Sequence, residues 1–386
     1  MRATKLFTEF FESEKAGGAT LLICTLASIL LSNSFLGNTY IHFWHLKIGS
    51  LSLEHIINDG LMTIFFLLIG LELEREVYIG ELSNLKNALL PISAAIGGMM
   101  VPALLYFLFT KDTAYQSGIG IPMATDIAFA IGILSLLGNK VPTSLKIFLT
   151  ALAVIDDLGA ILIIAIFYSK QIDLTYLLLS LGIFGILLLM NRLKIYKLLP
   201  YLIGGLFMWY FMLNSGVHAT ITGVLLAFAI PFGNGEENSI SYQLQHCLHK
   251  PVSFVILPIF ALANTAIALN FNNSESLFPI YAYAIIFGLV IGKPLGIFTF
   301  SYLSVKLKFS KLPSDLNWPK IIGVGILGGI GFTMSIFITL LAFTDEQVIN
   351  NAKLHIIIAS LIAGILGLLF LKNILKEEIN ITDEES

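Results

Sequence analysis

Long apolar segments follow one another along almost the whole chain, and they limit what it can fold into more than any other feature. A helix needs about 20 mostly apolar residues to cross a bilayer. Twelve segments, separated by polar or glycine- and proline-bearing breaks, approach that requirement: residues 16–36, 56–72, 88–109, 118–137, 145–168, 173–190, 198–214, 216–231, 251–270, 279–302, 320–343 and 354–371. The pattern predicts an all-α integral membrane protein with about twelve transmembrane helices.

The composition supports the same class of protein. Of the 386 residues, 56% are hydrophobic and 12% are charged, and the mean hydropathy is +0.87. These values exclude a water-soluble globular domain. The formal net charge is −3 and no basic stripe is present, so nucleic-acid binding is not expected. The two cysteines, Cys24 and Cys247, do not make a disulfide framework.

The positions of the basic residues predict the orientation of the spans. An even number of spans places both termini on one side. If that side is the cytoplasm, seventeen lysines and arginines fall in cytoplasmic segments and four in external ones, with Lys293 left inside a span. Cytoplasmic loops of membrane proteins carry such an excess. We therefore predict one polytopic membrane domain, residues 1–386, with spans near 16–371, a short cytoplasmic N-terminus and an acidic cytoplasmic tail at 373–386.

Two spans are poorly suited to continuous helices. Residues 118–129, GIGIPMATDIAF, place two glycines and Pro122 just before Asp126, and residues 323–335, GVGILGGIGFTMS, contain five glycines. A helix loses about 1 kcal/mol at each glycine and about 3 kcal/mol at a proline. Broken backbone is tolerated in a membrane only where protein or a water-filled cavity surrounds it. Paired broken spans indicate the binding site of a secondary transporter; alternatively, the glycines only allow close helix packing.

Ionisable residues are rare inside the spans, and two of them are adjacent. Asp156 and Asp157 lie in the middle of the span at 145–168. One carboxylate at the centre of a transmembrane helix opposes insertion by roughly 2.5 to 3.5 kcal/mol. Neighbouring side chains point about 100° apart around a helix, so one aspartate can pair with Lys293 while the other binds a cation or a proton. The alternative is an ion pair with a purely structural role.

Three other intramembrane groups have less specific interpretations. Asp126 lies beside the first break, where its carboxylate would offset the positive N-terminal ends of half-helices, and Lys293 would offset the negative C-terminal ends. His218 is either a hydrogen-bonded packing histidine or a group that titrates near neutral pH. Asp59 lies close to the outer end of its span and is expected at the interface.

Charged residues also gather at the cytoplasmic end of the second span, in LELEREVYIGE: Glu72, Glu74, Arg75, Glu76 and Glu81. A solvated charge run is one interpretation. Another predicted cytoplasmic segment contains Gln245, His246 and His249. Acids near histidines respond to pH between about 5 and 8, so a pH-sensing role is the second interpretation. The sequence leaves both open.

Eight motifs run through the chain. The most specific are ATDIAFA at 124–130, VIDDLGA at 154–160 and IGKPLG at 291–296. The other five are FFLLIGLELERE, AAIGGMMVPALLY, NSGVHATITGV, LPIFALANTAI and GGIGFTMSIFI. In their order and spacing they resemble the NhaA family of sodium/proton antiporters, and the resemblance covers the chain from about residue 10 to residue 372.

The resemblance implies inverted repeats in which two interrupted helices cross at mid-membrane. It also implies an electrogenic exchange in the bacterial inner membrane, which takes in more protons than it expels sodium or lithium ions and serves pH and sodium homeostasis. The chain would be a secondary active transporter and not an enzyme. It would need no cofactor, and its partners would be Na⁺, Li⁺, H⁺ and the lipid bilayer. The external segment 38–54 would form the hairpin through which the family dimerises.

The resemblance also implies roles for individual residues. Asp156 and Asp157 would be the paired carboxylates that bind Na⁺, Thr125 and Asp126 would belong to the first helix break, and Lys293 would pair with Asp156. The cytoplasmic pH-response region would comprise Arg75, Glu76, His246 and His249. Two positions depart from the family pattern and leave the pH set point open: Glu74 stands where a lysine is common, and Gln245 stands where a glutamate is expected.

The aspartate pair predicts competition at one site. Protonated aspartates hold no sodium, whereas deprotonated ones supply the hard oxygen ligands that a small cation prefers, together with Thr125 and backbone carbonyls. Two other functions use similar residues. An intramembrane aspartyl protease needs two carboxylates that share a proton about 3 Å apart, whereas adjacent residues of one helix point in different directions. A cation channel is disfavoured by the paired breaks and by a lysine in the ion path.

Overall fold

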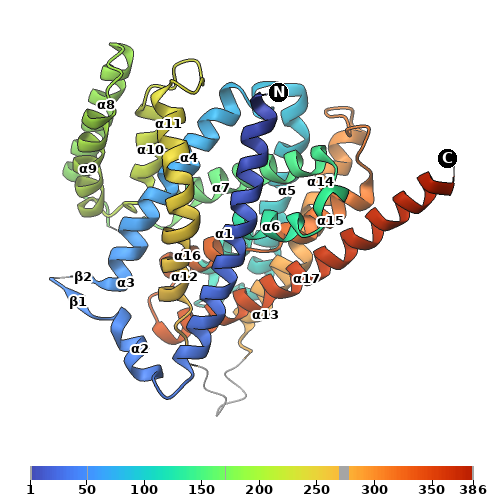
Figure 1. Ribbon diagram of the computed structural model, residues 1–386. Coiled ribbons are helices and arrows are strands. Elements are labelled where there is room, and N and C mark those ends of the chain that lie inside the picture. Colours follow the sequence, from blue (N-terminus) through green and yellow to red (C-terminus); the bar gives the residue numbers. More distant parts are fainter. Residues whose placement is uncertain (1, 50, 170, 269–277, 385–386) are drawn as a thin grey trace. The chain divides into compact units, whose positions relative to one another are not determined.

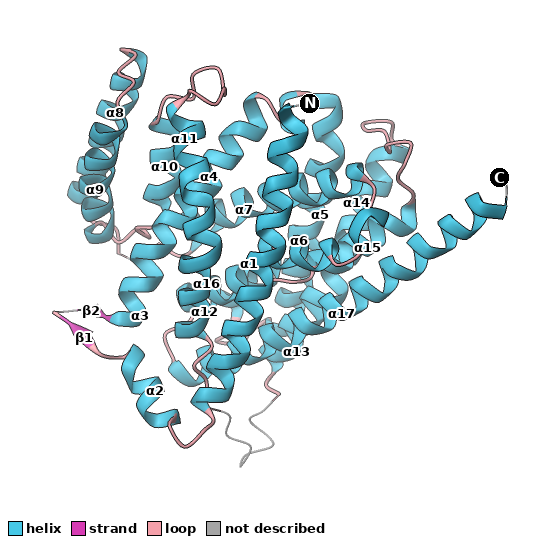
Figure 2. Ribbon diagram, viewed as in Figure 1, coloured by secondary structure: helices cyan, strands magenta, loops and turns pink. Residues whose placement is uncertain are grey.

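The computed structural model describes residues 2–49, 51–169, 171–268 and 278–384. Residue 50 of the segment 38–54, Lys170, the last two residues of the predicted span 251–270 and residues 385–386 of the predicted tail lie outside these ranges. The described chain is helical except for two short strands and the connecting turns (Figure 2). It divides into two compact units.

The first unit takes in Met1–Ile23, Asn84–Ala160 and Ile267–Ser386. It contains the start of α1 (Arg2–Ser32) and most of α7 (Thr143–Phe167), helices that continue into the second unit. Its other elements are α5 (Leu85–Thr110), η3 (Gln116–Met123), α6 (Ile127–Ser135), η4 (Gly138–Lys140), α13 (Ile280–Phe287), η7 (Gly288–Gly292), α14 (Lys293–Lys306), α15 (Trp318–Gly328), α16 (Phe332–Ala342) and α17 (Glu346–Glu384). The π-helical turn η7 joins α13 and α14 into one apolar span.

Helices α5 and α14 form the most extensive helix pair of this unit (Figure 1). Glycines allow the pairing. A Cβ atom on Gly97 would clash with the carbonyl oxygen of Gly296 at 2.2 Å, and one on Gly296 would clash with the carbonyl oxygen of Gly97 at 2.0 Å. Small residues let helix backbones approach closely in membranes, where packing replaces the hydrophobic effect as the driving force. This pairing fixes the start of α14, where Lys293 is located.

The second unit takes in Cys24–Ser83 and Ile161–Ala266. Its elements are α2 (Gly37–Trp44), β1 (Lys47–Ile48), β2 (Leu51–Ser52), α3 (Leu53–Ile56), η1 (Ile57–Leu61), α4 (Met62–Tyr78), η2 (Glu81–Ser83), α8 (Leu174–Arg192), α9 (Leu198–Asn214), α10 (Ile221–Ala229), α11 (Ile240–Pro251), η5 (Val252–Ile256) and α12 (Leu257–Asn264). The π-helical turns η1 and η5 each lie within a longer apolar span, Leu53–Tyr78 and Ile240–Asn264.

The helices are those of a multi-pass membrane protein. Within the described ranges, nine are long and apolar enough to cross a membrane, and the pair α15 and α16 makes a tenth if it is one span bent by 46°. Helix α9 has 17 residues and α10 has 9, fewer than the roughly 20 that a straight span requires. The mostly helical, multi-pass membrane fold is therefore confirmed, whereas the number twelve stays a prediction.

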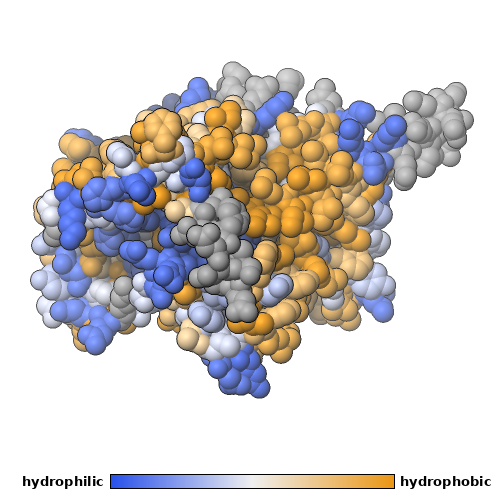
Figure 3. Space-filling view, turned by 90° about the horizontal axis from the view of Figure 1, so that it is seen from below, coloured by the Kyte–Doolittle hydropathy of each residue, from blue (hydrophilic) through white to orange (hydrophobic). Residues whose placement is uncertain are grey.

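Large apolar side chains cover much of the protein surface. Leu178 and Ile186 on α8 and Leu206 on α9 are exposed, as are most of their large apolar neighbours on the same two helices. Figure 3 shows a broad hydrophobic area on one face of the protein. Soluble monomers rarely expose large contiguous apolar patches. We therefore expect this surface to face the lipid chains of a membrane.

The ends of the chain and the segment 38–54 differ in detail from the expectations. Helix α1 begins at Arg2, before the predicted first span, and α17 continues as a helix through the predicted tail to Glu384. Strands β1 and β2 pair antiparallel, with Lys47 opposite Ser52, which confirms a short hairpin. The preceding residues form α2 instead, where Tyr40 and Trp44 lie one helical turn apart and their rings pack edge to face at 5.9 Å.

Candidate functional site

Regular helix is lost in the first unit at two places rich in glycine or proline. The 3₁₀ helix η3 ends at Met123, the backbone is extended at Ala124 and Asp126, and α6 follows. Helix α15 ends at Gly328, and α16 begins at Phe332 after a bend of 46°. The two irregular stretches touch, because the amide of Asp126 donates a hydrogen bond to the carbonyl oxygen of Ile330 at 2.6 Å. Helix ends from four elements therefore meet in one place.

Asp126 satisfies the N-terminal ends of two of these helices. Its Oδ1 accepts a hydrogen bond from the amide of Phe129 in α6 at 3.0 Å. Its Oδ2 accepts from the amide of Thr333 at 3.0 Å and from the hydroxyl of the same residue at 2.6 Å, both in α16. Helix N-termini carry unpaired N–H groups and a partial positive charge. One buried carboxylate thus compensates both ends, and it ties α6 to α16.

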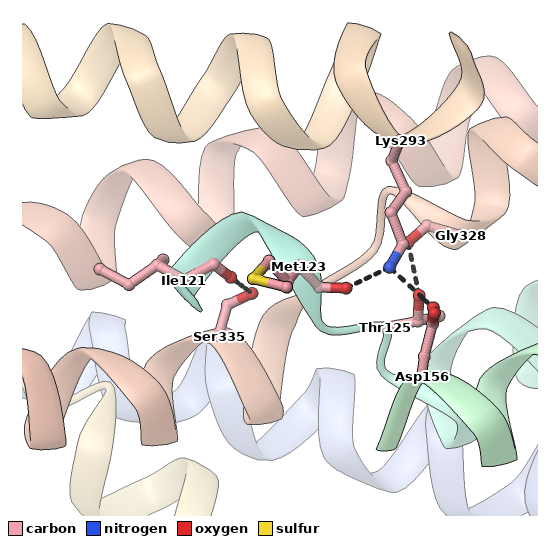
Figure 4. A network of polar contacts seen from close by, with 7 residues as sticks. All are labelled: Ile121, Met123, Thr125, Asp156, Lys293, Gly328 and Ser335. Carbon is pink, nitrogen blue, oxygen red and sulfur yellow. Dashed lines mark hydrogen bonds and ion pairs between the residues drawn. The ribbon is translucent and has the colours of Figure 1, made fainter. Parts of the chain in front are cut away.

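A second buried carboxylate, Asp156, forms the centre of a polar network that Figure 4 shows. The ammonium Nζ of Lys293 lies 2.7 Å from Asp156 Oδ2, and both side chains have an exposed fraction of 0%. Lys293 also donates to the carbonyl oxygen of Met123, at the C-terminal end of η3. The hydroxyl of Thr125 lies 2.8 Å from Asp156 Oδ2 and 2.9 Å from the carbonyl oxygen of Gly328, where α15 ends.

The network has the chemistry of a site for a small cation or a proton. An ion pair out of water survives only with good geometry and further hydrogen bonds, and Lys293 and Thr125 supply them to Oδ2. The other oxygen, Oδ1 of Asp156, accepts no hydrogen bond from the described residues. Carboxylate, hydroxyl and carbonyl oxygens are the ligands that hard cations prefer. Asp157, the next residue of α7, is fully buried as well.

The site contains individual groups that the sequence did not specify. The hydroxyl of Ser335 in α16 donates to the carbonyl oxygen of Ile121 in η3 at 2.7 Å (Figure 4), which gives Ser335 a partner that its position beside the second break did not predict. Carbonyl groups of Met123 and Gly328 also take part. A backbone carbonyl has no sequence signature of its own. The available signal is its place at the end of a helix, where the last carbonyls lack intrahelical partners.

In the second unit, one residue near the end of α4 and one on α11 contact the same aromatic ring. Arg75 donates a hydrogen bond to Gln245 at 3.5 Å, and its guanidinium lies 5.4 Å from the centre of the Tyr242 ring. His246 stacks on the same ring at 6.3 Å. Tyr242, which lies outside the eight sequence motifs, is therefore the residue that brings Arg75 and His246 together.

The other ionisable residues of this region have surroundings of their own. Glu76 accepts a hydrogen bond from the amide of Glu81 at 3.0 Å, just beyond the end of α4. Glu74 is buried, and the Ser241 hydroxyl of α11 hydrogen-bonds to it. His249 is half-buried and lies on α11 one turn after His246. Because Glu74 is buried, the interpretation of LELEREVYIGE as a solvated charge run is wrong for this residue.

The two isolated ionisable residues have ordinary partners in the second unit. Nε2 of His218 lies 3.0 Å from the carbonyl oxygen of Tyr168, the arrangement of a hydrogen-bonded packing histidine. A carboxylate oxygen of Asp59 lies 3.0 Å from Nε2 of His55, one turn earlier in the chain, and both side chains are partly exposed. Both partners, Tyr168 and His55, belong to the second unit.

Comparisons with known proteins identify the family. The chain matches the Na⁺/H⁺ antiporter 1 family over residues 8–371. The Na⁺/H⁺ antiporter NhaA of Flavobacterium psychrophilum is 68% identical over 379 residues, which cover 98% of this chain and 99% of that protein. The Na⁺/H⁺ antiporter NhaA of Cytophaga hutchinsonii is 61% identical over 380 residues, 98% of each chain.

A solved structure shares the fold. The sodium proton antiporter MjNhaP1 from Methanocaldococcus jannaschii aligns with a TM-score of 0.56 over 97% of this chain and 99% of its own, at 13% sequence identity. A likeness at that identity concerns the fold alone. The family match along nearly the whole length and the high identity to NhaA proteins confirm the resemblance of the motifs: this chain belongs to the Na⁺/H⁺ antiporter 1 family.

Proposed function

We propose that the chain exchanges Na⁺ or Li⁺ for H⁺ across the bacterial inner membrane, expelling the metal cation as protons enter. The observation that carries this function is the buried pair of Asp156 and Lys293, which lies where two broken helical elements meet. The network needs no cofactor for this exchange. It belongs to a secondary active transporter, and relatives that are 68% and 61% identical are Na⁺/H⁺ antiporters by name.

In this account Asp156 and Asp157 hold either protons or a cation. When both are deprotonated they offer carboxylate oxygens to Na⁺, with Thr125 and the carbonyls of Met123 and Gly328 close to Asp156. An arriving cation competes with the ammonium of Lys293 for Oδ2 of Asp156. Protonation removes the negative charge that retains the cation. Exclusive binding, with access alternating between the two sides of the membrane, couples the two flows without ATP.

The exchange is electrogenic if more than one proton enters for each Na⁺ that leaves. A surplus of protons moves positive charge inward, so an inside-negative potential drives the cycle. The presence of two carboxylates and one ammonium in the same buried region supports this, because three titratable groups can bind more protons than the single charge of Na⁺ replaces.

We propose the finer fold of the family as well. The segments η3–α6 and α15–α16 are the two interrupted helices, crossing at mid-membrane within a twelve-helix arrangement of inverted repeats that works as a single transport domain. The hydrogen bond between Asp126 and Ile330 supports the crossing. The excess of basic residues in the predicted cytoplasmic segments supports cytoplasmic termini.

The pH response and the dimer interface are assigned to the second unit. Arg75, Glu76, His246 and His249 adjust activity to pH, which the shared contacts of Arg75 and His246 with Tyr242 support. The segment 38–54 joins two copies of the chain. In its short hairpin, strand β1 is exposed together with the side chain of Ile48, and exposed strand edges are templates for pairing with another chain.

Proton movement in everted membrane vesicles tests the proposed function. Respiration acidifies their interior, and we expect added Na⁺ or Li⁺ to collapse this gradient, with little response to K⁺, at several values between about pH 6 and pH 9 around the histidine pKa of about 6.5. Vesicles without the protein are the control. A channel would pass cations without moving protons, and a protease would give no response. Equal responses to K⁺ and Na⁺ contradict selective exchange.

A further inference from the structure

The turn that follows α14 has an unusual backbone. Lys308 has φ +62°, a conformation in which glycine normally ends a helix. Two hydrogen bonds hold the turn: the amide of Lys308 donates to the carbonyl oxygen of Val305 at 3.0 Å, and the amide of Phe309 donates to that of Ser304 at 2.9 Å. Lysine thus occupies a backbone conformation that disfavours residues with a side chain, so the presence of a charged side chain at this position needs an explanation.

Buried hydroxyls fix the direction of the turn. The Ser310 side chain is buried, and its oxygen lies 2.9 Å from the hydroxyl of Ser304, which in turn accepts from the hydroxyl of Ser93 in α5 at 3.1 Å. Because Ser310 is held inward against α14 and α5, its neighbours Phe309 and Lys311 are directed outward, and both are exposed.

The outer surface of the turn combines cations with apolar side chains. Leu307 is 60% exposed and Phe309 65% exposed. Lys306, Lys308 and Lys311 are exposed as well, and none of the three forms an ion pair with a described residue. Water would favour the lysines and disfavour the apolar pair, whereas the boundary between headgroups and acyl chains suits both.

Aromatic residues beside the turn indicate the same boundary. The ammonium of Lys306 lies 5.9 Å from the ring centre of Tyr302, and the ring of Trp318, at the start of α15, packs edge to face against Tyr302 at 5.2 Å. Trp and Tyr are enriched at membrane–water interfaces, where one part of the ring is apolar and another is wet.

We propose that the surface formed by Lys306–Lys311, Tyr302 and Trp318 binds the phosphate headgroups of anionic membrane lipids. Three ammonium groups supply the charge that a phosphate requires, and Leu307 and Phe309 insert among the upper parts of the acyl chains. A soluble anion would use the lysines and would leave the exposure of Leu307 and Phe309 unexplained. The proposal concerns a surface outside the Asp156 network and does not depend on the transport function.

The same pattern recurs at the end of another helix. Residues 192–197 read RLKIYK, where residues 306–311 read KLKFSK. Lys194 has φ +57°, and Leu193 and Tyr196 are exposed beside it. A basic residue thus ends both α8 and α14, and a leucine, a lysine in the left-handed conformation and an apolar residue follow it. A shared environment at both helix ends accounts for this recurrence.

Trp318 provides a reporter for bound lipid. The chain has three tryptophans, so a protein with Trp44→Phe and Trp209→Phe retains Trp318 alone. The full chain is reconstituted into mixed vesicles of phosphatidylcholine and phosphatidylglycerol, in which one lipid carries bromine high on its acyl chain and quenches nearby tryptophan. At equal brominated fractions, we expect brominated phosphatidylglycerol to quench Trp318 at least twice as strongly as brominated phosphatidylcholine.

Neutralising the lysines tests their role. Lys306→Gln, Lys308→Gln and Lys311→Gln together are expected to make the two lipids quench equally, since each lysine near an anionic surface contributes about fivefold in affinity. Lys47→Gln with Lys111→Gln, which changes exposed lysines of strand β1 and of the turn after α5, is the matched control and should keep the preference. Phosphatidylglycerol retained per protein after purification in detergent provides a second measurement and should fall only in the triple variant.

Three results would overturn the proposal. The first is a triple variant that keeps both the quenching preference and the retained phosphatidylglycerol. The second is equal quenching by the two lipids before any lysine is changed. The third is loss of the preference when soluble glycerol phosphate is added in excess, because that result assigns the surface to a free phosphate.

Discussion

Asp157→Asn is expected to abolish Na⁺-driven proton movement. Asparagine preserves the shape of the side chain but carries no negative charge and does not titrate. Asp157 is fully buried on α7, next to the Asp156 network. Removing one partner of a buried charge pair, here the carboxylate proposed to bind Na⁺, costs about 3 to 5 kcal/mol, which lowers Na⁺ affinity by roughly two to four orders of magnitude at about 1.4 kcal/mol per tenfold change. The collapse of the proton gradient in everted vesicles measures the loss.

An exposed aspartate provides the matched control. Asp112 lies on a turn of the first unit with φ +61°, a conformation that asparagine adopts readily. Asp112→Asn makes the same chemical change at an exposed position outside the Asp156 network and should leave exchange unchanged. With equal amounts of protein in the vesicles, near-normal exchange by Asp157→Asn would exclude this carboxylate from the ion site.

Lys293→Met and Asp156→Asn are each expected to destabilise the protein strongly, and the double variant much less. Both side chains have an exposed fraction of 0%, and their charged atoms lie 2.7 Å apart. Either single change leaves one charge buried without its partner, at a cost of about 3 to 5 kcal/mol, whereas removing both charges can be close to neutral. Thermal unfolding of the purified protein in detergent measures each variant, and the four proteins form a double-mutant cycle.

The cycle separates an ion pair from independent packing effects. Lys111→Met removes an exposed lysine of the same unit and should leave the unfolding temperature unchanged. Coupling between Lys293 and Asp156 should recover most of the lost stability in the double variant. If the losses of the two single variants simply add, the pair does not hold the two helices together and Lys293 acts through Met123 alone.

The sequence predicts the membrane architecture well because lipid imposes length and polarity on every span. It predicts helix ends less well. The predicted span 216–231 begins before α10, which starts at Ile221, because the backbone forms turns from Gly216, with φ +83°, to Thr220 before the helix begins. Residues 38–44 were expected in a hairpin and form α2, where Tyr40 and Trp44 contact each other at helical spacing.

The candidate site was predictable where it consists of charged side chains in a costly environment. Asp126, Asp156 and Lys293 are exceptional inside apolar spans, and their motifs point to the same site. The carbonyls of Met123 and Gly328 were not predictable as partners, because their role follows from where η3 and α15 end in space. The same holds for Tyr242, whose ring receives Arg75 only when α4 and α11 pack together.

Proton release on cation binding tests the central claim most directly. Purified protein in weakly buffered detergent solution is mixed with NaCl, LiCl or KCl while the pH is recorded. Competition at one site predicts that Na⁺ and Li⁺ acidify the solution, that K⁺ does not, and that Asp157→Asn shows no acidification. Heat of Na⁺ binding without proton release, or unchanged acidification in Asp157→Asn, would contradict exchange of cation and proton at the aspartate pair.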